Sequence, residues 1–224
     1  PNGIKYEADL NWSAINDIKV QTDGKVLVTG NYAIQISTMS TYRLNANGIA
    51  LDTTFGVNGR KDLPVAGGGS NFSRSYGIKL LSDGKILLAG QGWDGTRSLF
   101  YVAKLNINGS LDTTFNTTGT LFYATAGANW EGRSIDVQSD GKILVGGFSG
   151  PSGTTMDVTL MRINPDGTND TSFNNTGYLI KNYVNISSKA AKVISTTDSI
   201  FVIGDLDTNL DLKEDEFLIL KLLK

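Results

Sequence analysis

The chain of 224 residues carries a formal charge of −2, and 40% of its residues are hydrophobic, as in an ordinary globular protein. No basic excess indicates nucleic-acid binding, and no apolar run approaches the roughly 20 residues that cross a membrane, so we expect neither nucleic-acid binding nor membrane insertion. The sequence has no Cys and no His. Disulfides, thiolate or histidine catalysis, and Cys- or His-ligated metals are therefore excluded.

A short Asp-Gly motif recurs along the chain. Clear copies lie at 22–30, 82–90 and 139–147, and a weaker copy lies at 197–204. The copies close on Gly30, Gly90, Gly147 and Gly204, at intervals of 60, 57 and 57 residues. A fixed period of this size indicates a repeat architecture.

Each repeat is predicted to contain four strands. The first strand follows a glycine, at 4–6, 60–63, 120–123 and 178–181. The second strand alternates apolar and polar residues, which is typical of a half-buried strand. Its copies lie around 18–20, 78–80 and 135–137, and the fourth copy, around 193–194, fits the alternation less well.

The Asp-Gly pair then predicts a hairpin turn, because glycine adopts a positive φ at little cost. The third strand is almost continuously apolar, at 26–28, 86–88, 143–145 and 200–202. Such a strand is expected to be buried on both faces. The fourth strand ends on a basic–aliphatic pair, at 43–44, 104–105, 162–163 and 221–222.

A connector follows the fourth strand at 45–55, 106–115 and 164–173. In each connector we expect an Asp to cap a turn and a Phe to plug the seam between neighbouring repeats. These residues are Asp52, Asp112, Asp170, Phe55, Phe115 and Phe173. The aspartates of the Asp-Gly pairs are also interpreted as turn residues, since one active site does not need a copy in every repeat.

The repeats are predicted at about 1–58, 59–118, 119–176 and 177–224. A small four-stranded sheet cannot bury both faces alone, but radial stacking of several sheets can. The prediction is an all-β, β-propeller-like domain of four repeats, each with four antiparallel strands. Four is a small number for a closed ring. The alternative is a larger ring, completed by other residues of a longer chain or by other subunits.

The repeated pattern is S-D-G-K-I-L-x-x-G, then R-L-N-x-x-G, then L-D-T-x-F. It resembles the delta-60 repeat found in large secreted and surface proteins of bacteria. The resemblance covers nearly the whole chain, although the fourth repeat lacks the Gly and Lys of the turn. It implies a β-propeller-like module in an extracellular or cell-surface setting, and it supplies no catalytic residues.

Aromatic residues gather at the ends of the predicted strands away from the Asp-Gly turns. Trp12, Phe72 and Trp130 lie between the first and second strands, and Trp93 lies between the third and fourth. Asparagines precede the first three, namely Asn11, Asn71 and Asn129. Aromatic faces beside amides suit sugar rings, so these seven residues form the predicted ligand-binding face. The alternative is that the rings pack over the sheets and the asparagines cap turns.

A second candidate site lies between the last two predicted strands. Asp205, Asp207, Asn209 and Asp211 alternate with other residues, and such oxygen ligands can converge on Ca²⁺. The segment lacks the glycine that the calcium-loop pattern requires, and a solvated hairpin is the alternative. No other cofactor is expected.

Together these features predict a non-enzymatic binding module of a bacterial surface or secreted protein. It would recognise a glycan or a cell-surface protein in the manner of an adhesin. Two alternatives remain. One is a structural or oligomerisation domain, such as the tip of a trimeric fibre. The other is a glycoside hydrolase with paired carboxylates.

Overall fold

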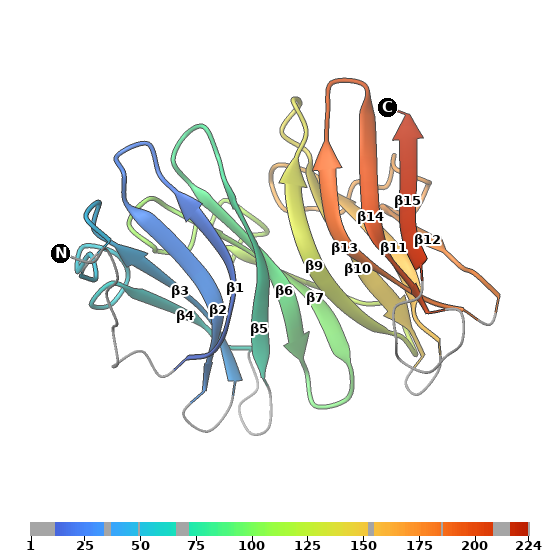
Figure 1. The fold of residues 1–224 in the computed structure, drawn as a ribbon, viewed down its shortest axis with the longest axis horizontal. Helices are drawn as coiled ribbons and strands as arrows, with labels where there is room; N and C mark the ends of the chain where they lie inside the picture. Colours follow the sequence, from blue (N-terminus) through green and yellow to red (C-terminus); the bar gives the residue numbers. More distant parts are fainter. Residues whose placement is uncertain are drawn as a thin grey trace.

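The computed structural model describes residues 12–33, 37–48, 50–65, 72–151, 155–184, 186–207 and 216–223. All regular secondary structure in these ranges is β-strand, arranged as four sheets side by side (Figure 1). This confirms the all-β prediction. Within the same ranges, no helix is long and apolar enough to span a membrane.

Each sheet is an antiparallel meander in which strand order follows the chain. The first sheet contains β1 (Trp12–Val20), β2 (Val26–Ala33), β3 (Ser37–Leu44) and β4 (Arg60–Leu63). The second contains β5 (Ser73–Leu80), β6 (Ile86–Trp93), β7 (Ser98–Leu105) and β8 (Thr120–Tyr123). The third contains β9 (Asn129–Val137), β10 (Ile143–Gly150), β11 (Asp157–Ile163) and β12 (Tyr178–Lys181). The fourth contains β13 (Ser187–Ser195), β14 (Ser199–Asp207) and β15 (Glu216–Leu223).

The Asp-Gly pairs form the hairpin turns that the sequence predicts. Gly24, Gly84 and Gly141 have φ values of 80°, 81° and 84°. In each turn the Asp carboxylate accepts a hydrogen bond from the backbone N–H two residues later, at 3.1 Å. These aspartates are therefore turn residues, and the hairpins they close join the first two strands of each sheet.

One prediction about strand order is wrong. Segment 60–63 was expected to begin the second repeat, but it forms β4 and pairs with β3 of the first sheet, with Tyr42 opposite Arg60. The connector causes this arrangement, because it folds back along β3 and Arg43 N–H donates to the Gly59 carbonyl. Strands β8 and β12 complete their sheets in the same way. Segment 4–6 lies outside the described residues.

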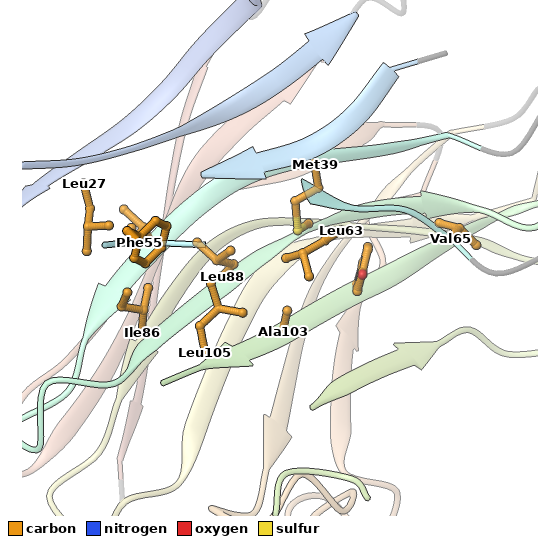
Figure 2. Close-up of a cluster of buried hydrophobic side chains, with 11 residues drawn as sticks. Leu27, Met39, Phe55, Leu63, Val65, Ile86, Leu88, Ala103 and Leu105 are labelled. Carbon is orange, nitrogen blue, oxygen red and sulfur yellow. The ribbon is translucent and has the colours of Figure 1, made fainter. Parts of the chain in front are cut away.

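The core lies in the seams between neighbouring sheets. Figure 2 shows the first seam, where Leu27, Ile86 and Leu88 lie around the Phe55 ring and Met39 lies beside Leu63. Phe55 and Phe115 are fully buried in the first and second seams, and Phe173 packs partly buried against the third. The prediction that these phenylalanines plug the seams is confirmed.

Ion pairs fix each connector to its own sheet. Lys85, from the Asp-Gly-Lys turn, lies 2.9 Å from the Asp112 carboxylate, and the Thr114 hydroxyl donates to the same carboxylate at 2.7 Å. Lys25 reaches Asp52 and Lys142 reaches Asp170 in the same way, each at 3.0 Å. The lysine of the repeated motif therefore has a structural role.

Candidate functional site

An aromatic pair marks the end of the second sheet away from its Asp-Gly turn. Phe72 immediately precedes β5, and Trp93 is the last residue of β6. The antiparallel register places the two residues opposite each other, and Trp93 N–H donates to the Phe72 carbonyl at 2.8 Å. Their rings are parallel within 1°, with centroids 6.0 Å apart. Both residues are half-buried, so part of the pair faces solvent.

Arg74 extends this pair along β5. Its guanidinium carbon lies 4.8 Å from the centroid of the Phe72 ring, an arrangement in which the ring face attracts the cation. Burial raises the pKa values of Tyr76 and Glu131. The positive charge of Arg74 opposes this rise at both groups. Arg74 therefore connects the aromatic pair with a group of charged residues on the adjoining strands.

β-bulges on the first strand of the second and third sheets orient two of these residues. In β5 the register shifts between Ser75 and Gly77, so Tyr76 is the extra residue, and in β9 the extra residue is Arg133. A bulge redirects the side chain of its extra residue and often lies beside a functional site. The Arg133 guanidinium carbon lies 4.4 Å from the centroid of the Tyr76 ring.

In the last three motif copies, the closing glycine makes room for the bulge. A Cβ on Gly90 would collide with the carbonyl of Arg74, and a Cβ on Gly147 would collide with that of Glu131. In the fourth sheet, Gly204 stands in the same relation to Lys189. The repeated glycines thus place Arg74, Glu131 and Lys189 at equivalent positions on three neighbouring sheets.

The charged cluster consists of Arg74, Tyr76, Glu131, Arg133, Phe148 and Lys189. Arg133 Nε and Glu131 Oε1 form an ion pair at 2.6 Å, and Glu131 is only 8% exposed. The Lys189 amino group lies 5.7 Å from the centroid of the Phe148 ring, and Arg133 approaches the same ring. The cluster holds three cationic side chains and one carboxylate, so it is suited to an anionic ligand.

The structure brings Phe72 and Trp93 together but removes Trp130 from the predicted binding face. Trp130 is fully buried, and its ring packs edge-on against Phe100, Tyr123 and Tyr178 at centroid distances of 5.0–5.2 Å. Its indole N–H donates to the Thr125 hydroxyl at 3.2 Å. The ring has no face left for a ligand, so the packing alternative holds here.

Asn129 also has a structural partner, because its side-chain oxygen accepts a hydrogen bond from Ser98 N–H at 2.8 Å. This bond ties the start of β9 to the start of β7, which is the capping role given as the alternative. For Trp12 the described structure covers the β1 backbone but not the side chain. Asn11 and Asn71 lie outside the described residues.

The predicted calcium site is only partly covered by the structure. Asp205 and Asp207 lie at the end of β14, whereas Asn209 and Asp211 fall outside the described residues. Within the described ranges, no group of three or more acidic residues is placed to hold a metal ion. The calcium site therefore stays a prediction.

The sequence did not predict the charged cluster. Except for Phe148, which lies on β10, its members lie on the first strand of each sheet, where the neighbouring apolar residues recur but these positions change from repeat to repeat. The equivalent bulge residues are Asn16, Tyr76, Arg133 and Ala191. Variation at fixed positions of a repeated framework was the available signal, because packing alone would favour similar residues there.

Adjacent antiparallel meanders joined through apolar seams define an all-β, β-propeller-like repeat protein. A family model described as a beta-propeller domain of unknown function (DUF5122) matches residues 21–55, 81–115 and 138–173. These three matches support a β-propeller repeat family, and each begins just before an Asp-Gly turn and ends at the Phe of a connector. No curated protein matches the chain significantly.

Three of the similar solved structures are of carbohydrate-active enzymes. An ulvan lyase, described as a new family of polysaccharide lyase (PL25), has a TM-score of 0.52 at 12% identity, over 92% of this chain and 55% of that chain. The lyase bound to -[GlcA(1-4)Rha3S]- gives a TM-score of 0.50 over the same shares, also at 12% identity. An α-L-arabinofuranosidase from Clostridium thermocellum gives 0.48 at 13% identity, over 94% and 68%. The chain spans about half the length of the lyase, and this likeness shows the fold alone.

Proposed function

We propose that this chain is a non-enzymatic binding module that recognises an acidic glycan, one rich in carboxylate or sulfate groups. The parallel Phe72–Trp93 pair with Arg74 beside it is the observation that carries the proposal. Partly exposed aromatic rings offer an apolar face to the C–H side of a sugar ring. An arginine beside these rings, as Arg74 is beside Phe72, can bind a carboxylate or sulfate through two hydrogen bonds.

The charged cluster supports an acidic rather than a neutral ligand. Arg74 and Arg133 both act on Tyr76, and Arg133 and Lys189 both lie over Phe148, so positive charge is present on three neighbouring sheets. Glu131 offsets one of these charges through its ion pair with Arg133. An anionic chain that lies on Trp93 and continues over β5 and β9 would then meet cationic groups along its path.

A glycoside hydrolase is not favoured. Hydrolysis of a glycosidic bond ordinarily uses two carboxyl groups, one on each side of the bond. The charged cluster contains a single carboxylate, Glu131, which is buried and paired with Arg133. Binding without cleavage needs only the aromatic and cationic groups.

We also propose that the module belongs to a bacterial surface or secreted protein and acts in adhesion. This proposal depends on the resemblance of the repeated pattern to delta-60 proteins. A cell-surface protein is the alternative ligand, and its binding would equally use the loops at the Trp93 end of the sheets.

A polysaccharide binding array tests the proposed ligand class. The array would contain dextran sulfate and polygalacturonate beside neutral dextran, with wild-type protein and Trp93→Ala applied under the same conditions. We expect retention of the acidic polymers alone and a loss of at least about tenfold in affinity for Trp93→Ala. Equal binding to dextran and dextran sulfate would contradict the proposal. Release of reducing ends or unsaturated uronate from the polymers would show that the module is an enzyme.

A further inference from the structure

The first sheet exposes a face that is buried in every other sheet. We call the side of a sheet that faces the preceding sheet its leading face. Ile18 of β1 pairs with Val28, and the residues in this register in the later sheets are Ile78, Ile135 and Val193. Those three residues are 1–5% exposed, whereas Ile18 is 56% exposed. Val20 is 65% exposed, while its equivalents Leu80 and Val137 pack against seams.

The fourth sheet exposes its other side. We call the side of a sheet that faces the following sheet its trailing face. Phe217 of β15 stands at the position of Phe100 in the second sheet and Val158 in the third. Phe217 is 88% exposed, whereas Phe100 and Val158 are 0% and 2% exposed. Ile219 is 66% exposed, while its equivalents Val102 and Leu160 are 0% and 1% exposed.

The two exposed faces are the two halves of an interface that the molecule already contains. In the second seam, Phe100 and Val102 of a trailing face share one buried cluster with Ile135 of the next leading face. In the third seam, Val158 and Leu160 meet Val193 in the same way. A trailing face therefore fits a leading face of the same repeat, and this chain presents one free face of each kind.

The two free faces do not meet within the chain. The first and fourth sheets lie at opposite ends of the array in Figure 1, and the high exposure of Ile18 and Phe217 agrees with this placement. Large apolar patches that remain exposed on a protein commonly mark an interaction surface. Because each face is the counterpart of the other, a second copy of the chain has the matching face for either end.

We propose that the trailing face of the fourth sheet binds the leading face of the first sheet in a second copy of this chain. The contact is head to tail, so it leaves one free face of each kind on the pair. Repetition of the contact closes into a ring if the rotation between copies allows it and otherwise extends the array. This inference concerns assembly, and it stands independently of the proposed glycan ligand.

Mass measurement of two complementary variants tests this assembly. Ile18→Arg blocks the leading face, and Phe217→Arg blocks the trailing face. Both positions are exposed, so each variant should fold, and circular dichroism checks this. Wild-type protein is expected to form multiples of its 24.0 kDa mass in light scattering as its concentration rises. Each variant alone should be a monomer. An equimolar mixture should form a one-to-one complex, because each variant keeps the face that the other has lost.

Val57→Arg is the matched control, because Val57 is 77% exposed but lies in a connector turn away from both faces. It should assemble like the wild-type protein. A wild-type mass of 24.0 kDa at every concentration would overturn the proposal and indicate further repeats or another protein as the partner. Assembly of the single variants, or failure of the mixture to pair, would overturn it as well.

Discussion

Removal of the Phe115 ring tests how the sheets are held together. Phe115 comes from the connector after β7 and is fully buried in the seam between the second and third sheets. Its neighbours in the buried cluster include Leu87 and Val102 from one sheet and Ile143 from the other. The Lys104 amino group lies 5.9 Å from the ring centroid. Phe115→Ala therefore leaves a cavity that touches two sheets at once.

The expected loss of stability follows from this burial. Truncation of a fully buried phenylalanine costs about 3–5 kcal/mol, since the transfer free energy of the ring and the cost of the cavity add. For a chain of this length, such a loss lowers the melting temperature by about 6–20 °C. The hydrogen bond from Asn116 N–H to the Asp166 carbonyl keeps the connector attached to the next repeat, so the backbone has little freedom to fill the cavity.

Urea unfolding followed by tryptophan fluorescence is a suitable assay. Trp130 belongs to the same buried cluster as Phe115, so one of the three tryptophans that contribute to the emission lies in this seam. Val57→Ala, at an exposed position in the preceding connector, is the control and should change the free energy of unfolding by less than about 0.5 kcal/mol. If Phe115→Ala costs less than about 1 kcal/mol, the phenylalanines do not hold the seams and the packing argument is refuted.

Two further predictions concern the repeated motif. The Thr114 hydroxyl and Lys85 hold the pKa of Asp112 down to about 2 against the effect of burial, so ionised Asp112 stabilises the fold above about pH 4. That contribution is lost as the pH falls toward 2. Asp112→Asn should therefore lower the free energy of unfolding by about 1.5–3 kcal/mol at neutral pH and weaken the dependence of the melting temperature on pH between about 4 and 2. A pH profile equal to that of the wild-type protein would contradict this. Gly90→Ala should displace the Arg74 backbone at the β5 bulge and reduce glycan binding, and unchanged binding by a folded Gly90→Ala variant would contradict this.

The elements that depend on local chemistry could be predicted from the sequence. The Asp-Gly hairpins and the buried third strands follow from turn preferences and apolar runs, which need no knowledge of distant residues. The place of 60–63 could not be predicted in this way. It depends on the connector folding back on β3, which is fixed by hydrogen bonds between residues far apart in the repeat, such as Arg43 N–H to the Gly59 carbonyl.

The candidate site was predicted only in part for a similar reason. Phe72 and Trp130 each follow an Asn in the sequence, but Phe72 lies beside Trp93 at the end of the second sheet and Trp130 points into a seam. The side of a strand on which a ring lies depends on register, and each bulge shifts the register by one residue. The same bulges bring Tyr76 and Arg133 together, which no spacing in the sequence reveals.

Titration of Arg74→Gln against wild-type protein tests the central claim most directly. Dextran sulfate would be the probe, and Arg60→Gln the control, since Arg60 also lies over an aromatic ring, Tyr42, but in the first sheet. The account predicts that Arg74→Gln weakens binding by about tenfold or more, or at least about 1.4 kcal/mol, while Arg60→Gln binds like the wild-type protein. Equal affinities for wild-type protein and Arg74→Gln would contradict the account.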